Sequence, residues 1–260
     1  MKIATELPIH FQSVLAALTD YDFCIGCTYR DKPEYAEFYR AQRRKGRFVI
    51  LDNGAFEGEL LEDDDLIDAM RELHPQEVVA PDVISSSKDT LERARGFIAK
   101  LHDAGLRTQV QVAPQGKNFA EWTQSYHDLA NLPGVSTIGI SYVGHFDVPE
   151  DCDYFGDIEP EETIRLRFFH YLAGNRELRS DRAHHLLGLF SPAALSWYAK
   201  YPFIRSIDTS FPIVCAMHRT RMTSGVAKFQ DKLDYDATFT DDVLRLMIEN
   251  ILWMREECQK

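Results

Sequence analysis

Short apolar runs alternate with amphipathic helical patterns along the whole chain. The runs have the length and composition of buried parallel strands. Between them, apolar residues recur every three or four positions, the spacing of one helix face. The predicted strands are residues 22–28, 48–52, 77–82, 108–113, 137–142, 185–190 and 204–208, with 2–5 or 212–216 as an eighth. The predicted helices are residues 33–45, 63–73, 87–104, 119–131, 160–175, 192–200 and 241–258.

This alternation predicts parallel βα units. Seven or eight units within 260 residues favour a closed α/β barrel of the (β/α)8, TIM type over a doubly wound open sheet. No stretch has the composition of a linker, so we expect a single domain over residues 1–260. The long, aromatic and acidic segment 143–160 is expected to be a mobile loop over the functional end of the strands.

Composition narrows the classes of protein. The net charge of −12 argues against a protein that binds nucleic acid over its whole surface. No apolar stretch approaches the length of a membrane span. Cys24 and Cys27 have CxxC spacing inside an apolar run, but no second pair or nearby histidine completes a metal set. We therefore expect structural thiols. Five cysteines without a signal peptide are typical of a reducing cytoplasm.

Three aspartates each end an apolar run: Asp52, Asp82 and Asp208. The carboxyl ends of parallel strands meet at one edge of a sheet, where the chemistry of α/β proteins is found. Two carboxylates near one centre suit a nucleophile and a general acid/base, and a third can read a ligand. The alternative is that each aspartate caps the helix or turn that follows it.

Smaller features complete the set of candidates. Two clusters of cations, residues 40–47 and 218–221, are candidate phosphate contacts, although the first also suits a solvated helix end. His184 and His185 are neighbours on a predicted strand, so their side chains should face opposite sides of the sheet. We expect one to be a core residue and the other to line a site.

Six segments, in order, resemble the strand-end motifs of the tRNA-guanine transglycosylase superfamily. Its members exchange a guanine in nucleic acid for a 7-deazaguanine base on an α/β barrel. The last segment keeps the family's Asp-x-x-x-Pro nucleophile spacing. The segments are Asp52–Phe56, Val79–Asp82, Val112–Gly116, Ile138–Gly144, His184–Gly188 with the following Pro192, and Asp208–Pro212.

The resemblance implies a role for each matching residue. Asp208 would attack C1′ of the target nucleotide and form a covalent intermediate, with Asp52 as the general acid/base. Asp82 would accept hydrogen bonds from the guanine-type edge, and Gln115 would donate to its carbonyl oxygen. The remaining base contacts would come from Phe56 and Leu187 on the ring faces, the backbone of Ile140 and Ser141, and Asn53, Gly116 and Gly188. Arg219 and Arg221 would contact the nucleic-acid backbone.

Departures from the family pattern favour one class of substrate over another. The tRNA enzymes carry a Cys-x-Cys-x-x-Cys zinc site after the nucleophile, whereas this chain has only Cys215 and Cys258 there. Ile140 and Ser141 stand where the family usually has Gly-Leu. The chain is thus most similar to the compact, zinc-free DNA-guanine transglycosylases of 7-deazaguanine DNA modification, including phage versions. This implies DNA and a base of the preQ0 or preQ1 type as substrates, with no metal or other cofactor.

Three alternatives stay open at this point. The first is the same exchange on tRNA. The second is a catalytically silent barrel that serves as a binding subunit, against which the retention of both Asp52 and Asp208 argues. The third is a glycoside or nucleoside hydrolase that uses the same pair of carboxylates and releases the base without incorporation.

Overall fold

The computed structural model describes residues 1–56, 58–141, 160–189, 191–226, 229 and 231–260. The predicted loop 143–160 lies outside the described residues except for Pro160, and so does Cys152. The chain divides into two compact units, residues 22–140 and residues 1–21 with 141–260. The prediction of one domain stays a prediction.

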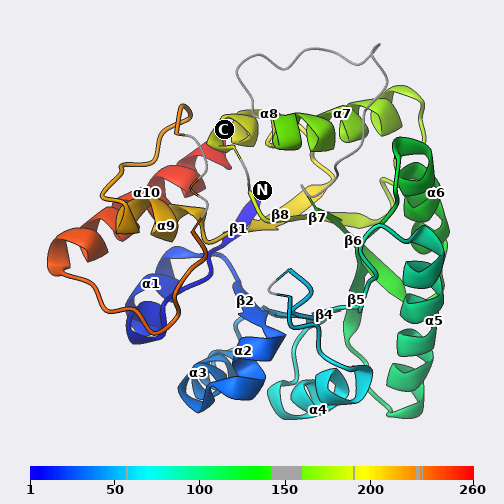
Figure 1. The fold of residues 1–260 in the computed structure, drawn as a ribbon, viewed down its shortest axis with the longest axis horizontal. Coiled ribbons are helices and arrows are strands. Elements are labelled where there is room, and N and C mark those ends of the chain that lie inside the picture. Colours follow the sequence, from blue (N-terminus) through cyan, green and yellow to red (C-terminus); the bar gives the residue numbers. More distant parts are fainter. Residues whose placement is uncertain (57, 142–159, 190, 227–228, 230) are drawn as a thin grey trace. The chain divides into compact units, whose positions relative to one another are not determined.

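The unit of residues 22–140 alternates strands with helices, and α5 packs beside α6 (Figure 1). Its elements are β2 (Asp22–Ile25), α2 (Gly26–Asp31), α3 (Pro33–Arg44), β3 (Val49–Asp52), α4 (Asp63–Leu73), β4 (Glu77–Val79), α5 (Ser87–Asp103), β5 (Gln109–Val112), α6 (Phe119–Ala130) and β6 (Val135–Ser141), whose last residue belongs to the other unit.

The other unit contains three strands, and α9 packs against α10. Its elements are β1 (Lys2–Ala4), η1 (Ile9–Phe11), α1 (Gln12–Leu15), η2 (Ala16–Leu18), α7 (Pro160–Gly174), β7 (Ala183–Leu187), η3 (Pro192–Ala194), α8 (Leu195–Tyr198), β8 (Ile204–Asp208), α9 (Phe211–Met217) and α10 (Asp241–Glu257).

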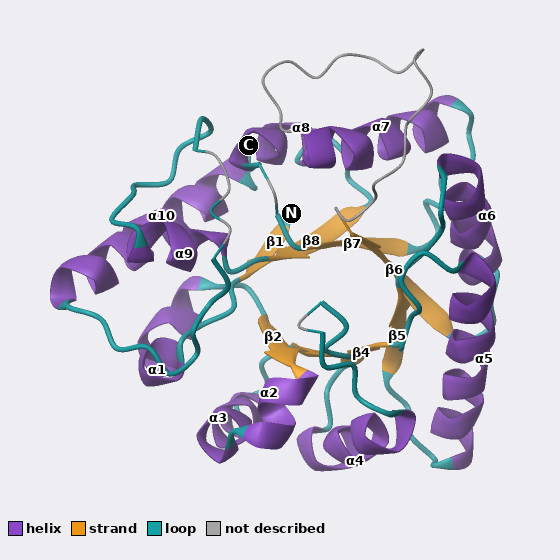
Figure 2. Cartoon of the chain, viewed as in Figure 1, coloured by secondary structure: helices purple, strands orange, loops and turns teal. Residues whose placement is uncertain are grey.

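All eight strands belong to one sheet in the order β1-β8-β7-β6-β5-β4-β3-β2, and the recorded pairings are parallel. Eight parallel strands that alternate with helices define the (β/α)8, TIM-type barrel class, so the predicted fold class is confirmed (Figure 2). The eighth strand is β1, whose Ala4 pairs with Asp208. Residues 212–216 lie in α9 instead, where Pro212 occupies the first turn that suits proline.

Several predicted strands are longer than the observed ones, and for two of them the structure shows a local cause. The strand predicted at 22–28 ends at Ile25, because α2 begins at Gly26. A Cβ at Gly26 would lie 2.4 Å from the carbonyl oxygen of Asp52, so only glycine fits this close approach. The strand predicted at 77–82 ends at Val79. Pro81 has no N–H to continue the ladder, so Asp82 lies beyond the strand end.

One polar contact is enclosed among β4, β5 and β6. Thr137 on β6 donates a hydrogen bond of 3.2 Å to the carboxylate of Glu77 on β4. Both side chains are fully buried, and so is Gln111 on the intervening strand β5. Parallel pairing sets Gln111 opposite Thr137 and Val79, which puts the three polar residues on the same face of the sheet.

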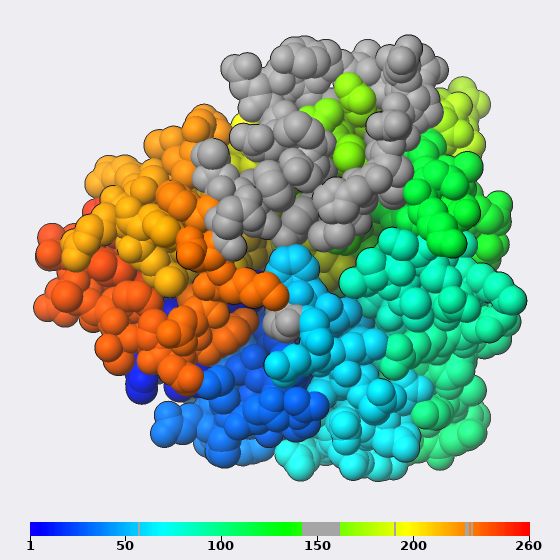
Figure 3. All heavy atoms as spheres, viewed as in Figure 1, coloured from blue at the N-terminus to red at the C-terminus, as the bar shows by residue number. Residues whose placement is uncertain are grey.

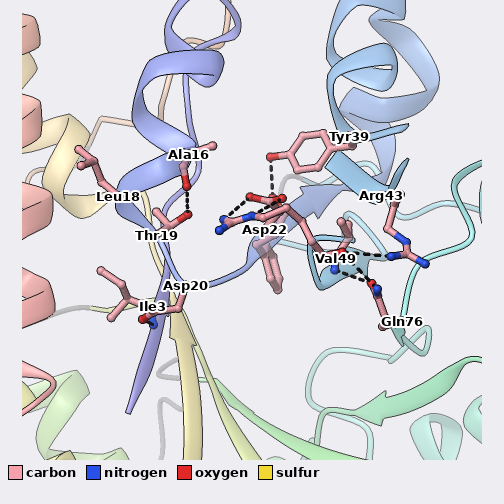
Figure 4. A network of polar contacts seen from close by, with 12 residues as sticks. Ile3, Ala16, Leu18, Thr19, Asp20, Asp22, Tyr39, Arg43, Val49 and Gln76 are labelled. Atoms are coloured by element: carbon pink, nitrogen blue, oxygen red, sulfur yellow. Dashed lines mark hydrogen bonds and ion pairs between the residues drawn. The ribbon is translucent and has the colours of Figure 1, made fainter. Parts of the chain in front are cut away.

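The basic cluster 40–47 is engaged in contacts within its own unit. Arg43 donates to the carbonyl oxygen of His74 at 2.7 Å. Gln76 donates to the carbonyl oxygen of Arg47 and accepts from the N–H of Val49 (Figure 4). Arg47 pairs with the buried Asp22 at 2.8 Å. These contacts favour the helix-end interpretation of this cluster over the phosphate-contact interpretation.

The described cysteines are buried. Burial, together with the negative charges of Asp22 and Asp52, raises the pKa of the Cys24 thiol well above its usual range. Burial also raises the pKa of Cys215 and of Cys258 to about 12. Such thiols are poor nucleophiles and poor metal ligands at neutral pH, which agrees with a structural role. Among the described residues, no helix is long and apolar enough to cross a membrane.

Candidate functional site

The first cluster of predicted site residues surrounds Asp82, which lies three residues beyond the end of β4. Asn53 donates to its Oδ1 at 3.1 Å, and Gln115 donates to its Oδ2 at 2.6 Å. Burial raises the pKa of Asp82 above its usual value, although the hydrogen bonds from Asn53 and Gln115 oppose this shift. The structure thus brings together three of the predicted base-reading residues.

Neighbouring backbone fixes both amide side chains. Asn53 also donates to the carbonyl oxygen of Ala80 at 2.9 Å, and its own oxygen accepts from the N–H of Ala55 at 2.8 Å. The Gln115 oxygen accepts from the N–H of Ser85 at 3.3 Å. Because each amide is held by its oxygen, its NH2 group is the end that faces the carboxylate.

Gly116 sits where α6 begins to pack on the segment that carries Gln115. A Cβ at Gly116 would lie 2.6 Å from the backbone nitrogen of Trp122. Trp122 donates through its indole N–H to the carbonyl oxygen of Pro114 at 2.8 Å, and the N–H of Gln115 donates to the hydroxyl of Ser125 at 3.2 Å. The start of α6 therefore positions Gln115.

Asp52 ends β3, and its side chain is buried. Its Oδ2 accepts a hydrogen bond of 2.8 Å from the N–H of Gly54, which has a φ of +80°. Phe56, two residues further on, is 58% exposed. It belongs to the loop after β3, which forms part of the surface in Figure 3. An exposed aromatic ring suits stacking on a planar ligand.

The second cluster surrounds Asp208 at the end of β8. His185 on β7 contacts Oδ1 of Asp208 through Nε2 at 2.9 Å and the hydroxyl of Ser206 through Nδ1 at 2.9 Å. The N–H of Gly188 makes a longer contact of 3.4 Å to the same Oδ1. The Asp208, His185 and Ser206 side chains are all buried.

The donors of this cluster form a consistent chain when His185 is neutral. A carboxylate only accepts, so Nε2 of His185 carries the proton, and Nδ1 accepts from the Ser206 hydroxyl. The Ser206 oxygen in turn accepts from Nε of Arg205 at 3.2 Å. Within the part of the chain that the structure describes, no hydrogen bond reaches Oδ2 of Asp208. One oxygen is held, and the other faces no donor among these residues.

The two neighbouring histidines of β7 face different surroundings, as the strand periodicity predicts. His184 packs edge-on against Phe169 and Phe203, whereas His185 contacts Asp208. His184 is therefore the core residue and His185 the one that lines the candidate site.

The other predicted site residues lie on the same elements or after them. Ile140 is buried, and Ser141, the last residue of β6, is half-buried. Leu187 ends β7 half-buried, and Gly188 follows it with a φ of +71°.

Arg219 and Arg221 are exposed residues of the segment between α9 and α10. Arg221 pairs with Glu249 of α10 at 2.6 Å. The buried Asn250 fixes the backbone of this segment by contacting Met222 and Thr220.

The residues predicted from the sequence do not include a charged cluster that reaches the end of β7 from α7. Arg165 and Glu162 of α7 pair at 2.5 Å, and both are fully buried. Arg165 also donates to the carbonyl oxygens of Leu187 and Gly188. The available signal was the oppositely charged pair Glu162 and Arg165, three positions apart in the sequence of α7.

Comparison of the sequence with models of known protein families and with curated proteins finds no match. Among the described residues, no group of three or more His, Cys, Asp or Glu side chains is placed to hold a metal ion. The fold defines the class, an α/β barrel in which catalytic groups follow strand ends. Its two buried clusters offer a carboxylate with amide donors and a carboxylate oriented by a histidine.

Proposed function

We propose that the protein is a base-exchange transglycosylase that replaces guanine in DNA with a 7-deazaguanine derivative. The observation that carries the proposal is the asymmetric environment of Asp208. Its Oδ1 is held by His185 and Gly188, and no described donor reaches its Oδ2. A carboxylate fixed in this way presents one oxygen for attack on an anomeric carbon.

The proposed reaction has two steps. Oδ2 of Asp208 attacks C1′, the bond between C1′ and N9 breaks, and Asp52 supplies a proton to the departing guanine. The incoming 7-deazaguanine base then gives its N9 proton to Asp52 and attacks C1′, which breaks the ester and frees Asp208. The same bond type is broken and formed, so no oxidant or metal is needed.

The cluster around Asp82 supports recognition of a guanine-type edge. Each oxygen of Asp82 accepts one amide donor and retains a lone pair, so it can also accept from the ring N1–H and the exocyclic amine of a base. Adenine offers an acceptor at N1, and a buried carboxylate would then face it unpaired. The exposed ring of Phe56 suits stacking on the base.

DNA is the proposed polymer because the chain lacks the zinc motif with which the resembling tRNA enzymes are built. The two cysteines after Asp208, Cys215 and Cys258, are buried in α9 and at the end of α10. The target nucleotide must leave its stack to reach buried carboxylates, which is the general requirement for chemistry on a base.

Nucleoside mass spectrometry tests the proposal. DNA and tRNA are digested from cells that express the gene or lack it, each supplied with a 7-deazaguanine base. The expected result is a 7-deazaguanine nucleoside in DNA, which disappears with Asp208→Asn. Appearance in tRNA alone would assign the other polymer. Release of guanine without incorporation would indicate a hydrolase, and no change in either polymer would indicate a binding protein.

Trapping the intermediate tests the role of Asp208 directly. Purified protein incubated with the target DNA and no incoming base should form a covalent adduct that survives denaturation. Asp208→Asn should retain its fold, measured by circular dichroism, and form no adduct. Normal turnover by Asp208→Asn would show that Asp208 is not the nucleophile.

A further inference from the structure

We propose that Arg165 is a positioning residue for Asp208 and acts through the peptide bond between Leu187 and Gly188. The inference rests on the proposed role of Asp208. Arg165 lies on α7, is fully buried, and donates to the carbonyl oxygen of Leu187 at 3.1 Å. The N–H of the same peptide unit belongs to Gly188 and points to Oδ1 of Asp208.

The geometry of a trans peptide makes this connection directional. Its C=O and N–H groups point in opposite directions, so the guanidinium and the carboxylate sit at the two ends of one dipole. A cation at the oxygen end polarises the peptide and strengthens the N–H as a donor. The contact from Gly188 to Asp208 is 3.4 Å, too long to orient the peptide by itself. The orientation therefore has to come from the other end.

The same guanidinium also fixes the next peptide. Its second terminal nitrogen donates to the carbonyl oxygen of Gly188 at 3.0 Å. Both peptide planes that flank the Cα of Gly188 are thus held, at a residue with a φ of +71°. The planar fork of arginine can reach two carbonyl oxygens at once, which a lysine ammonium on a flexible stem does less well.

Glu162 and Tyr198 keep Arg165 charged and in place. Burial disfavours the charge, but the Glu162 carboxylate and the Tyr198 hydroxyl raise the pKa of Arg165 above its ordinary value. Glu162 accepts from Nε of Arg165 at 2.8 Å and from the Tyr198 hydroxyl, and its other oxygen accepts from the N–H of Ser191 at 3.2 Å. The pair is therefore anchored on both sides of the Leu187–Gly188 turn.

The amide proton of Gly188 provides a test that needs no activity. In wild-type protein its NMR chemical shift should follow the ionisation of Asp208, because a hydrogen-bonded carboxylate shifts the amide that faces it. His185 also contacts Asp208, so Asp208→Asn identifies the part of the change that belongs to the carboxylate.

The main variant is the double change Glu162→Gln with Arg165→Met, which leaves no buried charge unpaired. We expect the amplitude of the Gly188 titration to fall to about half or less, because a polarised donor is lost. Arg255→Gln is the matched control. Arg255 also donates to a backbone carbonyl, that of Leu18, and pairs with Asp20, and its loss should leave the Gly188 titration unchanged.

A kinetic readout separates positioning from binding. In the double variant kcat for exchange should fall by roughly tenfold to a hundredfold, as expected when a reacting group is misplaced, while the KM for the free base stays within about twofold. If the wild type exchanges no base, the proposed function is wrong. The Gly188 titration still tests whether Arg165 positions Asp208, because it does not depend on activity.

Arg165→Lys keeps the test decisive if the double variant does not fold. It retains the charge and loses the two-pronged contact, so the Gly188 amplitude should be intermediate. A wild-type amplitude of the Gly188 titration in a folded Arg165 variant would overturn the proposal.

Discussion

The two histidines of β7 show how one strand serves the core and the candidate site at once. His185 donates to Asp208, and its other nitrogen is satisfied by Ser206. His184 is enclosed by aromatic rings, and burial lowers its pKa to about 4. Strand periodicity predicts the opposite facing of the two side chains. Which of them meets Asp208 depends on the register of β7 with β8, which local sequence does not reveal.

Acid should destabilise the protein through His184. Its pKa is about 4 in the folded state and near the ordinary 6.5 in the unfolded chain, so the unfolded state binds more protons between these values. The free energy of unfolding therefore falls as the pH drops from 6.5 towards 4, and this contribution reaches about 2 kcal/mol at pH 5.

Urea unfolding of wild type and His184→Leu at pH 7 and pH 5 measures this contribution. The variant should lose less stability than the wild type between the two pH values. His102→Leu, which changes a histidine with an exposed side chain, is the control and should follow the wild type. Equal losses in wild type and His184→Leu would contradict the prediction.

Base binding should depend on the ionisation of Asp82. Burial raises its pKa above the usual 3.8, and only the carboxylate can accept from both donors of a guanine-type edge. Affinity for a 7-deazaguanine base should therefore fall as the pH drops through the raised pKa of Asp82. Calorimetry between pH 4 and pH 7 measures this decrease.

The matching substitution is Asp82→Ala, which leaves the amides of Asn53 and Gln115 without their acceptor. The N1–H and exocyclic amine of the bound base would lose the same acceptor. Each unpaired buried group costs about 1–3 kcal/mol, so binding should weaken about tenfold or more at pH 7. Asp68→Ala, at an exposed acid that pairs with Arg71, should bind as the wild type does. Unchanged affinity in Asp82→Ala would remove Asp82 from the base-binding site.

At the scale of elements, two glycines differ in the space around them: one lies against the backbone of a helix, and the other lies on an exposed helix surface. A Cβ at Gly116 would meet the backbone of α6 at 2.6 Å, whereas nothing lies within 4 Å of a Cβ at Gly96 on the exposed side of α5. Gly116→Ala should lower the free energy of unfolding by about 1–3 kcal/mol through overpacking. Gly96→Ala should raise it by about 0.5–1 kcal/mol through helix propensity.

The same pair of variants should differ in ligand binding. Gly116→Ala displaces the segment that carries Gln115, so base affinity measured by calorimetry should drop. Gly96→Ala should leave it unchanged. If Gly116→Ala matches Gly96→Ala in both stability and affinity, α6 does not position Gln115.

Periodicity predicts most elements of this fold but not all of their boundaries. The long helices α3, α4 and α5 match the predicted ranges closely, because their amphipathic patterns are strong. The helix predicted at 192–200 is only the short η3 and α8. The end of β2 is set by the approach of Gly26 to Asp52, a contact between segments about 26 residues apart that no local pattern encodes.

For the candidate site, too, the sequence predicts some features and not others. Strand-end aspartates and their motifs lead to Asp52, Asp82 and Asp208 from sequence. The hydrogen bonds that orient them do not follow from it, since Arg165 reaches the loop after β7 from α7. The sequence of α7 contains several charged residues, and nothing in it marks Arg165 as the buried one until its partners are known.

At the scale of the whole molecule, the proposed function requires DNA to dock against a local basic surface, because the net charge of the chain is −12. Arg219 and Arg221 are exposed on a segment whose backbone Asn250 fixes. Replacing both with Ala should raise the KM for DNA and reduce the salt slope of binding by about one unit per lost phosphate contact. The KM for the free base should not change.

Filter binding or anisotropy over a range of salt concentrations measures this slope. Arg71→Ala with Arg176→Ala removes the same charge from other places and is the control, expected to retain the wild-type slope. An unchanged salt slope in the Arg219 and Arg221 variant would show that DNA does not dock against these two residues.

The enclosed contact between Glu77 and Thr137 has a consequence for how the chain assembles. Side chains along a strand point alternately to the two faces of the sheet. A shift of one residue in the pairing of β4 would therefore turn Glu77 towards the face that Val78 occupies. Val78 is fully buried, and a carboxylate in its place would lose the Thr137 hydroxyl without gaining water. Apolar strands alone tolerate such errors, because valine and isoleucine suit either face. The single acid in β4 therefore raises the free energy of any pairing of this strand that is shifted by one residue.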